Sequence, residues 1–217
     1  MTEASATRSN RFHRVRSGTQ ADADVEELNG DEYEGPATPE SAPPVSRSGD
    51  PAHPIERVTP GALVYVVGLH GGAGVSTVAS LLREQASDLP GEVARELRIA
   101  WPTSLQSGMP INVIAVARTH HQGLLAAERF ARAWAAGTLP GGRLLGIVLV
   151  DDGPHLAKAQ LKAVARIGRM TPHGWRIHWA EPWRLAEPSL KGSSPLVRWT
   201  IRRIRKLAQT PYTEGTK

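Results

Sequence analysis

The sequence predicts an α/β domain in which a mostly parallel sheet lies between layers of helices. Between about residues 60 and 208, short apolar runs alternate with segments whose apolar residues recur every three or four positions. This alternation is typical of parallel strands joined by helices. A glycine-rich turn also joins the first apolar run to the first helical pattern, and ligands of such sheets bind at strand ends of this kind. Together these observations predict a three-layer fold over residues 59–208.

Five segments of this domain are expected to be strands. Each is a short apolar run, which is the pattern of a buried strand. The first is expected at the centre of the sheet, and the second has the weakest pattern and is expected to stop at Pro102. The five are Leu63–Val67, Leu97–Trp101, Ile111–Ala117, Leu144–Val150 and Trp175–Trp179, the last with Trp175, Ile177 and Trp179 on one side.

Four helices are expected between and after these strands. The first begins at Ser76, the second opens with the capping-box spacing Thr119–Gln122 and ends at Gly137, the third follows Gly153, and the fourth covers Pro195–Ala208. Apolar residues at helical spacing are expected to face the sheet. They are Val78, Leu81, Leu82 and Leu89 in the first helix, Leu124, Ala127, Ala131 and Trp134 in the second, and Leu161, Val164, Ile167 and Met170 in the third.

The segment before this domain differs from it in composition and charge. Residues 1–58 hold few large apolar side chains, so they are expected to be disordered, and residues 209–217 are expected to be a flexible tail. Residues 1–58 contain six arginines and eleven carboxylates, whereas residues 59–217 contain twenty lysines or arginines and ten carboxylates. An acidic tail can bind the basic body, compete with its anionic partners, or only solubilise it.

Several classes of protein are excluded by composition. The chain contains no cysteine, so disulfides and thiolate metal sites are excluded. No apolar run approaches the ~18 residues of a transmembrane helix, and the first residues lack the apolar core of a secretory signal. The sequence therefore predicts a cytoplasmic protein.

The turn "VVGLHGGAGVST", Val66–Thr77, has the chemistry of a phosphate-binding loop. Its three glycines, Gly71, Gly72 and Gly74, permit positive φ, so consecutive backbone N–H groups can converge on an anion. Ser76 and Thr77 then begin a helix, whose amino terminus attracts negative charge. A phosphate is expected at this point.

The part "HGGAGVST" resembles the deviant Walker A motif of ParA/MinD-type ATPases, Lys-Gly-Gly-x-Gly-Lys-Ser/Thr. The resemblance implies a P-loop fold that binds ATP or GTP with Mg²⁺, Ser76 being the metal-binding hydroxyl. His70 stands at the signature lysine, which reaches across a dimer in that family, and Val75 stands at the phosphate-binding lysine. The nucleotide-binding residues that the resemblance implies are His70, Gly71, Gly72, Ala73, Gly74, Val75, Ser76 and Thr77.

Two departures from that family predict a degenerate site: both lysines of the loop motif are replaced, and a Walker B aspartate is missing from the expected strand. Loss of one charged hydrogen bond weakens binding by roughly ten- to a hundred-fold, and hydrolysis is expected to suffer more, because neither lysine meets the charge of the transition state. In addition, Leu97–Trp101 contains no aspartate to serve as Walker B. The remaining candidates are Asp151 and Asp152. The local pattern of these aspartates matches Walker B, whereas their position in the chain matches the base-reading loop of ParA-like folds. We favour the base-reading position. Capping of the next helix is the structural alternative.

Other polar residues follow predicted strand ends. Arg118 could meet a phosphate in place of the missing lysine. His120 and His121 could form a cluster with His70 or only begin a helix. In ParA-like folds the loop after the last strand packs on the base, so the resemblance implies a base contact by Pro182 or Trp183, whereas a tryptophan beside other tryptophans is more often part of the core. No catalytic residue is assigned.

The last predicted helix, "PLVRWTIRRIRKLAQ", has an apolar stripe of Val197, Ile201 and Ile204 beside a basic one. Its basic face could be solvated, could bind DNA phosphates nonspecifically, or could lie on an anionic membrane; the basic side chains are Arg198, Arg202, Arg203, Arg205 and Lys206.

These features predict a degenerate nucleotide-binding protein that acts as a switch or partner-regulating subunit. The combination "HGGAGVST … VARTH … WRIHWAEPWRL" resembles uncharacterised actinobacterial ParA-like proteins, which implies a role in plasmid or mobile-element maintenance or transfer. Protein partners, a homodimer among them, follow from the same resemblance. The alternatives are a pseudo-NTPase scaffold that binds DNA or protein without nucleotide, and an active hydrolase that uses Asp151 and Arg118 in unusual roles.

Overall fold

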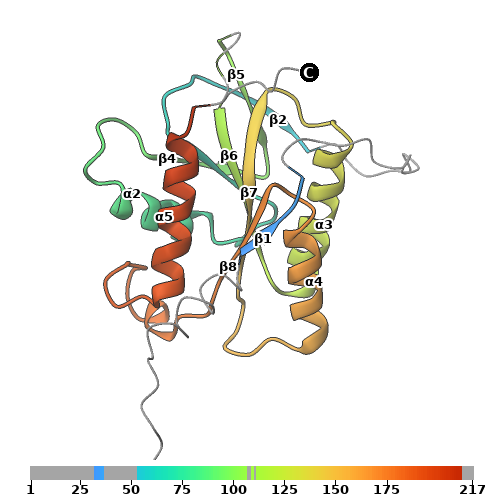
Figure 1. Cartoon of the computed structure of the whole chain (residues 1–217), viewed down its shortest axis with the longest axis vertical. Helices are drawn as coiled ribbons and strands as arrows, with labels where there is room; N and C mark the ends of the chain where they lie inside the picture. Colours follow the sequence, from blue (N-terminus) through green and yellow to red (C-terminus); the bar gives the residue numbers. More distant parts are fainter. Residues whose placement is uncertain (1–31, 37–52, 107–108, 110, 212–217) are drawn as a thin grey trace, which may run out of the picture.

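The computed structural model describes residues 32–36, 53–106, 109 and 111–211. Its main sheet has six strands in the order β1-β8-β7-β6-β3-β4, and only β1 is antiparallel to its neighbour (Figure 1). The strands of this sheet are β1 Glu32–Glu34, β3 Val64–Gly68, β4 Ala94–Arg98, β6 Ile111–Arg118, β7 Gly142–Val150 and β8 His173–Ile177.

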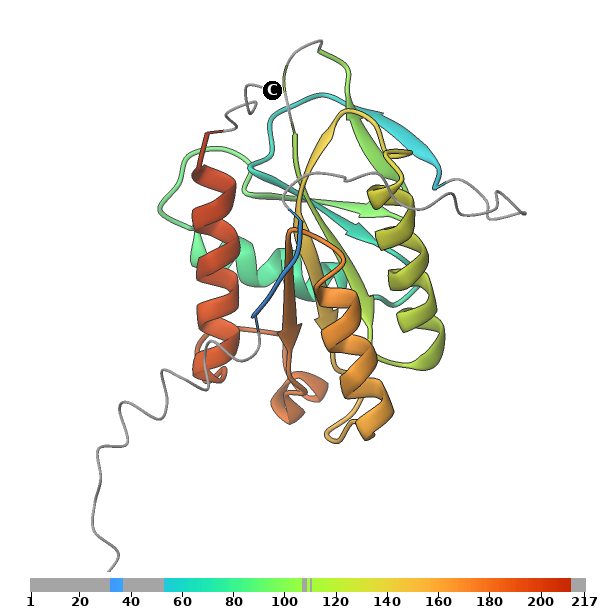
Figure 2. The same ribbon diagram turned by 45° about the vertical axis from the view of Figure 1, so that its right-hand side comes forward.

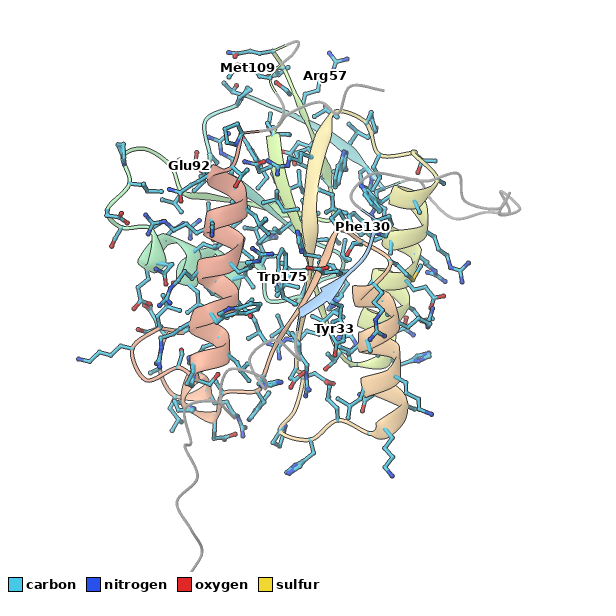
Figure 3. The ribbon with its side chains drawn as sticks, viewed as in Figure 1. Tyr33, Arg57, Glu92, Met109, Phe130 and Trp175 are labelled. Carbon is cyan, nitrogen blue, oxygen red and sulfur yellow. The ribbon has the colours of Figure 1, made fainter. Side chains whose placement is uncertain are left out.

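Helices cover both faces of the sheet. On one face, α2 (Val75–Gln85) and α5 (Pro195–Gln209) bury apolar side chains against β3, β6, β7 and β8; on the other, α3 (His121–Ala135) and α4 (Lys158–Gly168) do the same. The two pairs lie on opposite sides in both views (Figures 1 and 2). Phe130 and Trp175, which lie on opposite faces of the sheet, are almost fully buried (Figure 3). The predicted α/β fold with a mostly parallel sheet is therefore confirmed. The sheet has six strands instead of the predicted five, and β3 is not at its centre, because only β4 lies beyond it on that side.

The chain makes a corner where one weak strand was predicted. β4 ends at Arg98, Ile99 has a φ of 52°, and the chain then enters β5 (Trp101–Ser104). β5 pairs in parallel with β2 (Ile55–Val58) in a separate two-stranded sheet. The prediction that Leu97–Trp101 is one strand ending at Pro102 is wrong, because Pro102 lies inside β5, where pairing with a single neighbour leaves the other side of the strand free of ladder bonds.

Parts of the predicted N-terminal tail are regular structure. Glu32–Glu34 forms β1 and Ile55–Val58 forms β2, so the prediction of a tail without structure does not hold for these segments. The rest of residues 1–58 lies outside the described residues. The C-terminal tail was predicted to begin at residue 209, but Gln209 is the last residue of α5, and residues 212–217 again lie outside the description.

The helices begin and end at points that differ from the predictions. α2 begins at Val75 and ends at Gln85, so Leu89 lies in the following turn. The N-cap of α3 is His120, whose Nδ1 accepts a hydrogen bond from the Gly123 amide at 3.1 Å. Leu161 on α4 is 38% exposed and does not face the sheet. None of the described helices is long and apolar enough to cross a membrane.

Candidate phosphate-binding site

The glycine loop connects β3 to α2 and turns sharply at two glycines. The amide of Ala73 donates to the carbonyl of His70 at 3.3 Å, which closes a four-residue turn. Gly72 has a φ of 73° and Gly74, the N-cap of α2, has a φ of 97°. A side chain on either would be strained. Because a Cβ on Gly71 or Gly72 would meet nothing within 4 Å, the outer face of the loop is open.

Backbone donors are concentrated at this open face. Among the described residues, no hydrogen-bond acceptor pairs with the backbone amides of Gly71, Gly72 and Gly74, or with those of Val75, Ser76 and Thr77 in the first turn of α2, and no side chain caps the helix. The first turn of any helix leaves such donors. Here glycines lead into it, so the arrangement is a nest of donors with the chemistry for an anion.

Val75 does not face this nest. Its side chain is partly buried against the apolar cluster between α2, α5 and the sheet. Its Cγ2 lies so close to Gly68 that a Cβ added there would be 2.7 Å away. The position at which the related motif has a lysine is therefore used for packing against the end of β3.

A carboxylate lies beside the Ser76 hydroxyl. Ser76 Oγ donates to Glu96 Oε2 at 2.7 Å, and the other carboxylate oxygen accepts from Arg83 at 3.0 Å. Glu96 is on β4, which is paired directly with β3. Glu96 was not among the predicted site residues, because the predicted strand began at Leu97, three residues after the true start of β4 at Ala94. The alternation of Ala94, Glu96 and Arg98 on one side of the strand was the available signal.

Two histidines hold the loop against the end of β6. His70 Nε2 accepts from the backbone amide of Arg118 at 3.0 Å, so the ring hydrogen belongs on Nδ1, which lies 2.8 Å from the Gly71 carbonyl. The rings of His70 and His120 meet edge to face at 4.9 Å between centroids, whereas His121 is exposed. Among the residues that the structure describes, no group of three or more ligating side chains could hold a metal ion.

Arg118 reaches the loop through its backbone. Its guanidinium Nη1 donates to the carbonyl of Asp151 at 3.3 Å, which places it over the adjacent ends of β6 and β7. The structure thus brings Arg118 next to His70, but its side chain is directed toward β7. A phosphate contact by Arg118 stays a prediction.

The two aspartates after β7 are engaged within the protein. Asp151 is 3% exposed, and both its oxygens accept from Arg176, at 2.9 and 2.8 Å. Asp152 accepts from the buried Thr119 hydroxyl at 2.7 Å, so Thr119 does not cap α3. Neither aspartate caps the next helix, because α4 begins at Lys158 and its N-cap is Ala157; that alternative is wrong. Base reading by Asp151 stays a prediction, and it would require the Arg176 pair to rearrange.

The segment after β8 contains the other candidates for base contact. Pro182 and Trp183 lie in a single 3-10 turn, η1 (Glu181–Arg184). Pro182 is exposed, whereas Trp183 packs against the same apolar cluster as Val75. The packing of Trp183 agrees with the core alternative for that residue. Stacking of Pro182 on a base stays a prediction.

Some basic side chains of α5 form hydrogen bonds with other residues of the domain. Val197, Ile201 and Ile204 are buried as predicted. Arg198 donates to the Ser193 carbonyl at 2.6 Å, and Arg205 to the Gln85 carbonyl and to Asp88, both at 2.7 Å. These contacts support the structural alternative for the helix.

A cavity of about 410 Å³ lies at the opposite end of the sheet. It is lined by segments that precede β3, β4 and β6, among them Gly61, Leu89 and Met109. Since the glycine loop follows the carboxyl end of β3, this cavity is not part of the candidate phosphate site.

The fold and the site define an α/β protein whose glycine loop has open donors at the carboxyl edge of a mostly parallel sheet. The chain belongs to a family of unknown function, DUF6668, whose model matches residues 62–198. The match spans β3 to the first turn of α5 and leaves β1 and β2 outside. No curated protein and no solved structure matches the chain.

Proposed function

We propose that the protein binds a nucleoside triphosphate, ATP or GTP with Mg²⁺, weakly through Gly71–Thr77, and hydrolyses it little or not at all. The observation that supports this proposal is the set of unpartnered amides at the open face between Gly71 and the first turn of α2. A phosphate accepts several hydrogen bonds at once, and a nest at a helix amino terminus supplies them without any charged side chain.

Ser76 and Glu96 are the residues that would hold the metal ion. Mg²⁺ takes oxygen ligands and, in P-loop proteins, is held by the loop hydroxyl and a neighbouring carboxylate. The 2.7 Å contact between Ser76 and Glu96 offers this pair. Arg83 already pairs with Glu96, so a metal ion would have to compete with a guanidinium. This competition favours weak binding.

Weak hydrolysis is expected because no lysine occupies either lysine position of the related motif. Val75 packs into the core, and the His70 ring is engaged by Arg118 and Gly71. Charge that develops on the γ-phosphate in the transition state would therefore lack the lysine contacts of the related motif. Such a protein suits regulation of a partner, and the resemblance to ParA/MinD proteins implies maintenance or transfer of a plasmid or mobile element as the setting.

One observation favours the alternative function of a scaffold without nucleotide. Ser76, Glu96 and Arg83 satisfy one another, so the loop has a closed side-chain network before any ligand binds. In that case the glycine loop is a structural element, and binding of DNA or protein depends on basic surfaces elsewhere.

Thermal shift with millimolar ATP, ADP and GTP, with and without Mg²⁺, tests the proposal. Ligand binding stabilises by RT ln(1 + [L]/Kd), so a Mg²⁺-dependent rise of several degrees is expected. Gly72→Ala has a matched control in Gly91→Ala, since both glycines have positive φ and open space around a new Cβ. Both variants should lose similar stability, but only Gly72→Ala should lose the nucleotide effect. No shift with any nucleotide would favour the scaffold.

A further inference from the structure

Helices α3 and α4 form a strongly basic surface that the site does not use. They lie side by side on one face of the sheet (Figures 1 and 2). Together with the C-cap Arg169 they have six cationic side chains and a single carboxylate, Glu128. The six are Arg129, Arg132, Lys158, Lys162, Arg166 and Arg169, and all are exposed. We call this surface the α3/α4 basic face.

The cations of α4 form one straight stripe. Lys158, Lys162 and Arg166 are four residues apart, so they lie on the same side of the helix. Val164 and Ile167 are buried on the opposite side. From Lys158 to Arg169 the stripe is about 17 Å long, at 1.5 Å of rise per residue. It therefore faces away from the sheet along the whole length of α4.

Glu128 neutralises only part of this charge. It accepts from Arg132 and Arg166, both at 2.7 Å, and these two arginines lower its pKa to about 2. Lys158 and Lys162 form no ion pair or hydrogen bond through their side chains in the part of the chain that the structure describes. Unscreened like charges repel one another, so the stripe favours an anionic partner.

Strand β1 is anchored beside this stripe. The Tyr33 ring packs on Gly168, where an added Cβ would be 2.7 Å from its Cδ2, and the Arg169 guanidinium lies 5.3 Å from the ring centroid. Gly35 lies so close to the turn after α4 that a Cβ would be 2.2 Å from the Thr171 carbonyl. Figure 3 shows Tyr33 at this contact between β1 and α4. These contacts fix the chain at the end of the basic stripe.

The direction of β1 places its first residue toward the end of the sheet where α4 begins. Glu32 pairs with Trp175 and Glu34 with His173, so the chain comes into β1 from the carboxyl end of β8. Helix α4 begins at that same end of the sheet, with Lys158, and runs back toward His173. The amino-terminal end of β1, at Glu32, is therefore directed toward the end of the sheet where α4 begins with Lys158.

We propose that the acidic segment Asp22–Asp31 docks on the α3/α4 basic face of its own chain, with β1 as the tether. The segment has five carboxylates in ten residues: Asp22, Asp24, Glu26, Glu27 and Asp31. Fully extended, ten residues span about 33 Å, twice the length of the stripe. The segment covers a surface to which nucleic-acid phosphates and other polyanions would otherwise bind, and it is displaced as salt rises.

Disulfide trapping in the full chain tests this contact, because the natural sequence has no cysteine. We would pair Val25→Cys, inside the acidic segment, with Ala159→Cys, an exposed position beside the stripe. The expected rate of cross-linking within one chain is about tenfold faster at about 0.05 M salt than at 1 M, since the screening length falls to ~3 Å. Neutralising Asp22, Asp24, Glu26 and Glu27 to their amides keeps the tether but should abolish the salt effect.

A matched pair of charge variants locates the surface. Lys158→Gln with Lys162→Gln removes two exposed cations from α4, and Arg202→Gln with Lys206→Gln removes two with the same spacing from α5. Only the α4 pair should slow the cross-link. Equal slowing by both pairs would mean that net charge alone acts, and would overturn the proposal. A rate unchanged by neutralisation, or a disulfide between two chains instead of within one, would overturn it as well.

Discussion

The buried ion pair between Asp151 and Arg176 gives the sharpest prediction of stability. Arg176 is 18% exposed and Asp151 is 3% exposed, and the two form a bidentate contact. Arg176→Met leaves the Asp151 carboxylate buried without its guanidinium. Breaking such a pair from one side costs about 3–5 kcal/mol. For a domain of this size that corresponds to a fall in Tm of roughly 6–20 °C.

Urea unfolding followed by tryptophan fluorescence measures this loss, since Trp175 is the neighbour of Arg176 in β8. Arg184→Met is the control, because its pair with Glu181 is 64% exposed on both sides and should matter little. The double variant Asp151→Asn, Arg176→Met should recover most of the loss, because no charge is then left buried. If Arg176→Met is no more destabilising than Arg184→Met, the assignment of Asp151 to a structural pair is wrong.

Three further predictions concern the glycine loop, the tether β1 and the loss of folding stability at acid pH. Val75→Lys should destabilise the fold in a thermal melt, because it removes an apolar side chain packed near Gly68; a gain in ATP affinity without loss of stability would contradict this geometry. Gly168→Ala should displace Tyr33 and abolish hydrogen-exchange protection of the β1 amides, at a cost of roughly 1–3 kcal/mol; retained protection would contradict the contact. The pKa of Glu128 is lowered to about 2, so its stabilising effect is present above its ordinary value of 4.5 and is lost as pH falls toward 2. Glu128→Gln should flatten that part of the stability–pH curve, and an unchanged slope would count against the two arginine contacts.

The strands that were predicted correctly are those whose apolar pattern is continuous. Ile111–Arg118 and Gly142–Val150 are buried on both sides by helices, so almost every residue in them is apolar and the local sequence is sufficient. The order of elements around the glycine loop was predicted for the same reason: the turn requires glycines, and positive φ at Gly72 and Gly74 agrees with that requirement.

The errors occur where the decisive contact joins residues far apart in the sequence. Glu96 belongs to the candidate site because its carboxylate accepts a hydrogen bond from Ser76, twenty residues earlier in the chain. Tyr33 is part of the sheet because Gly168 leaves room for its ring. The corner at Ile99 depends on a second sheet formed with β2. The alternation along β4 indicates only which side of the strand Glu96 lies on, and the partners in all three contacts cannot be found from periodicity and composition.

Strand β1 also determines how the sheet ends. It pairs with His173–Trp175 of β8, and without it the backbone donors and acceptors on that side of β8 would be exposed. An unpaired strand edge is a template for pairing with other chains, which leads to aggregation. With β1 in place, the open edge on this side of the sheet is only the three residues Glu32–Glu34, and a very short edge strand is a poor template for such pairing. A variant that releases β1 should therefore fail first by loss of solubility at high concentration, before the domain itself unfolds.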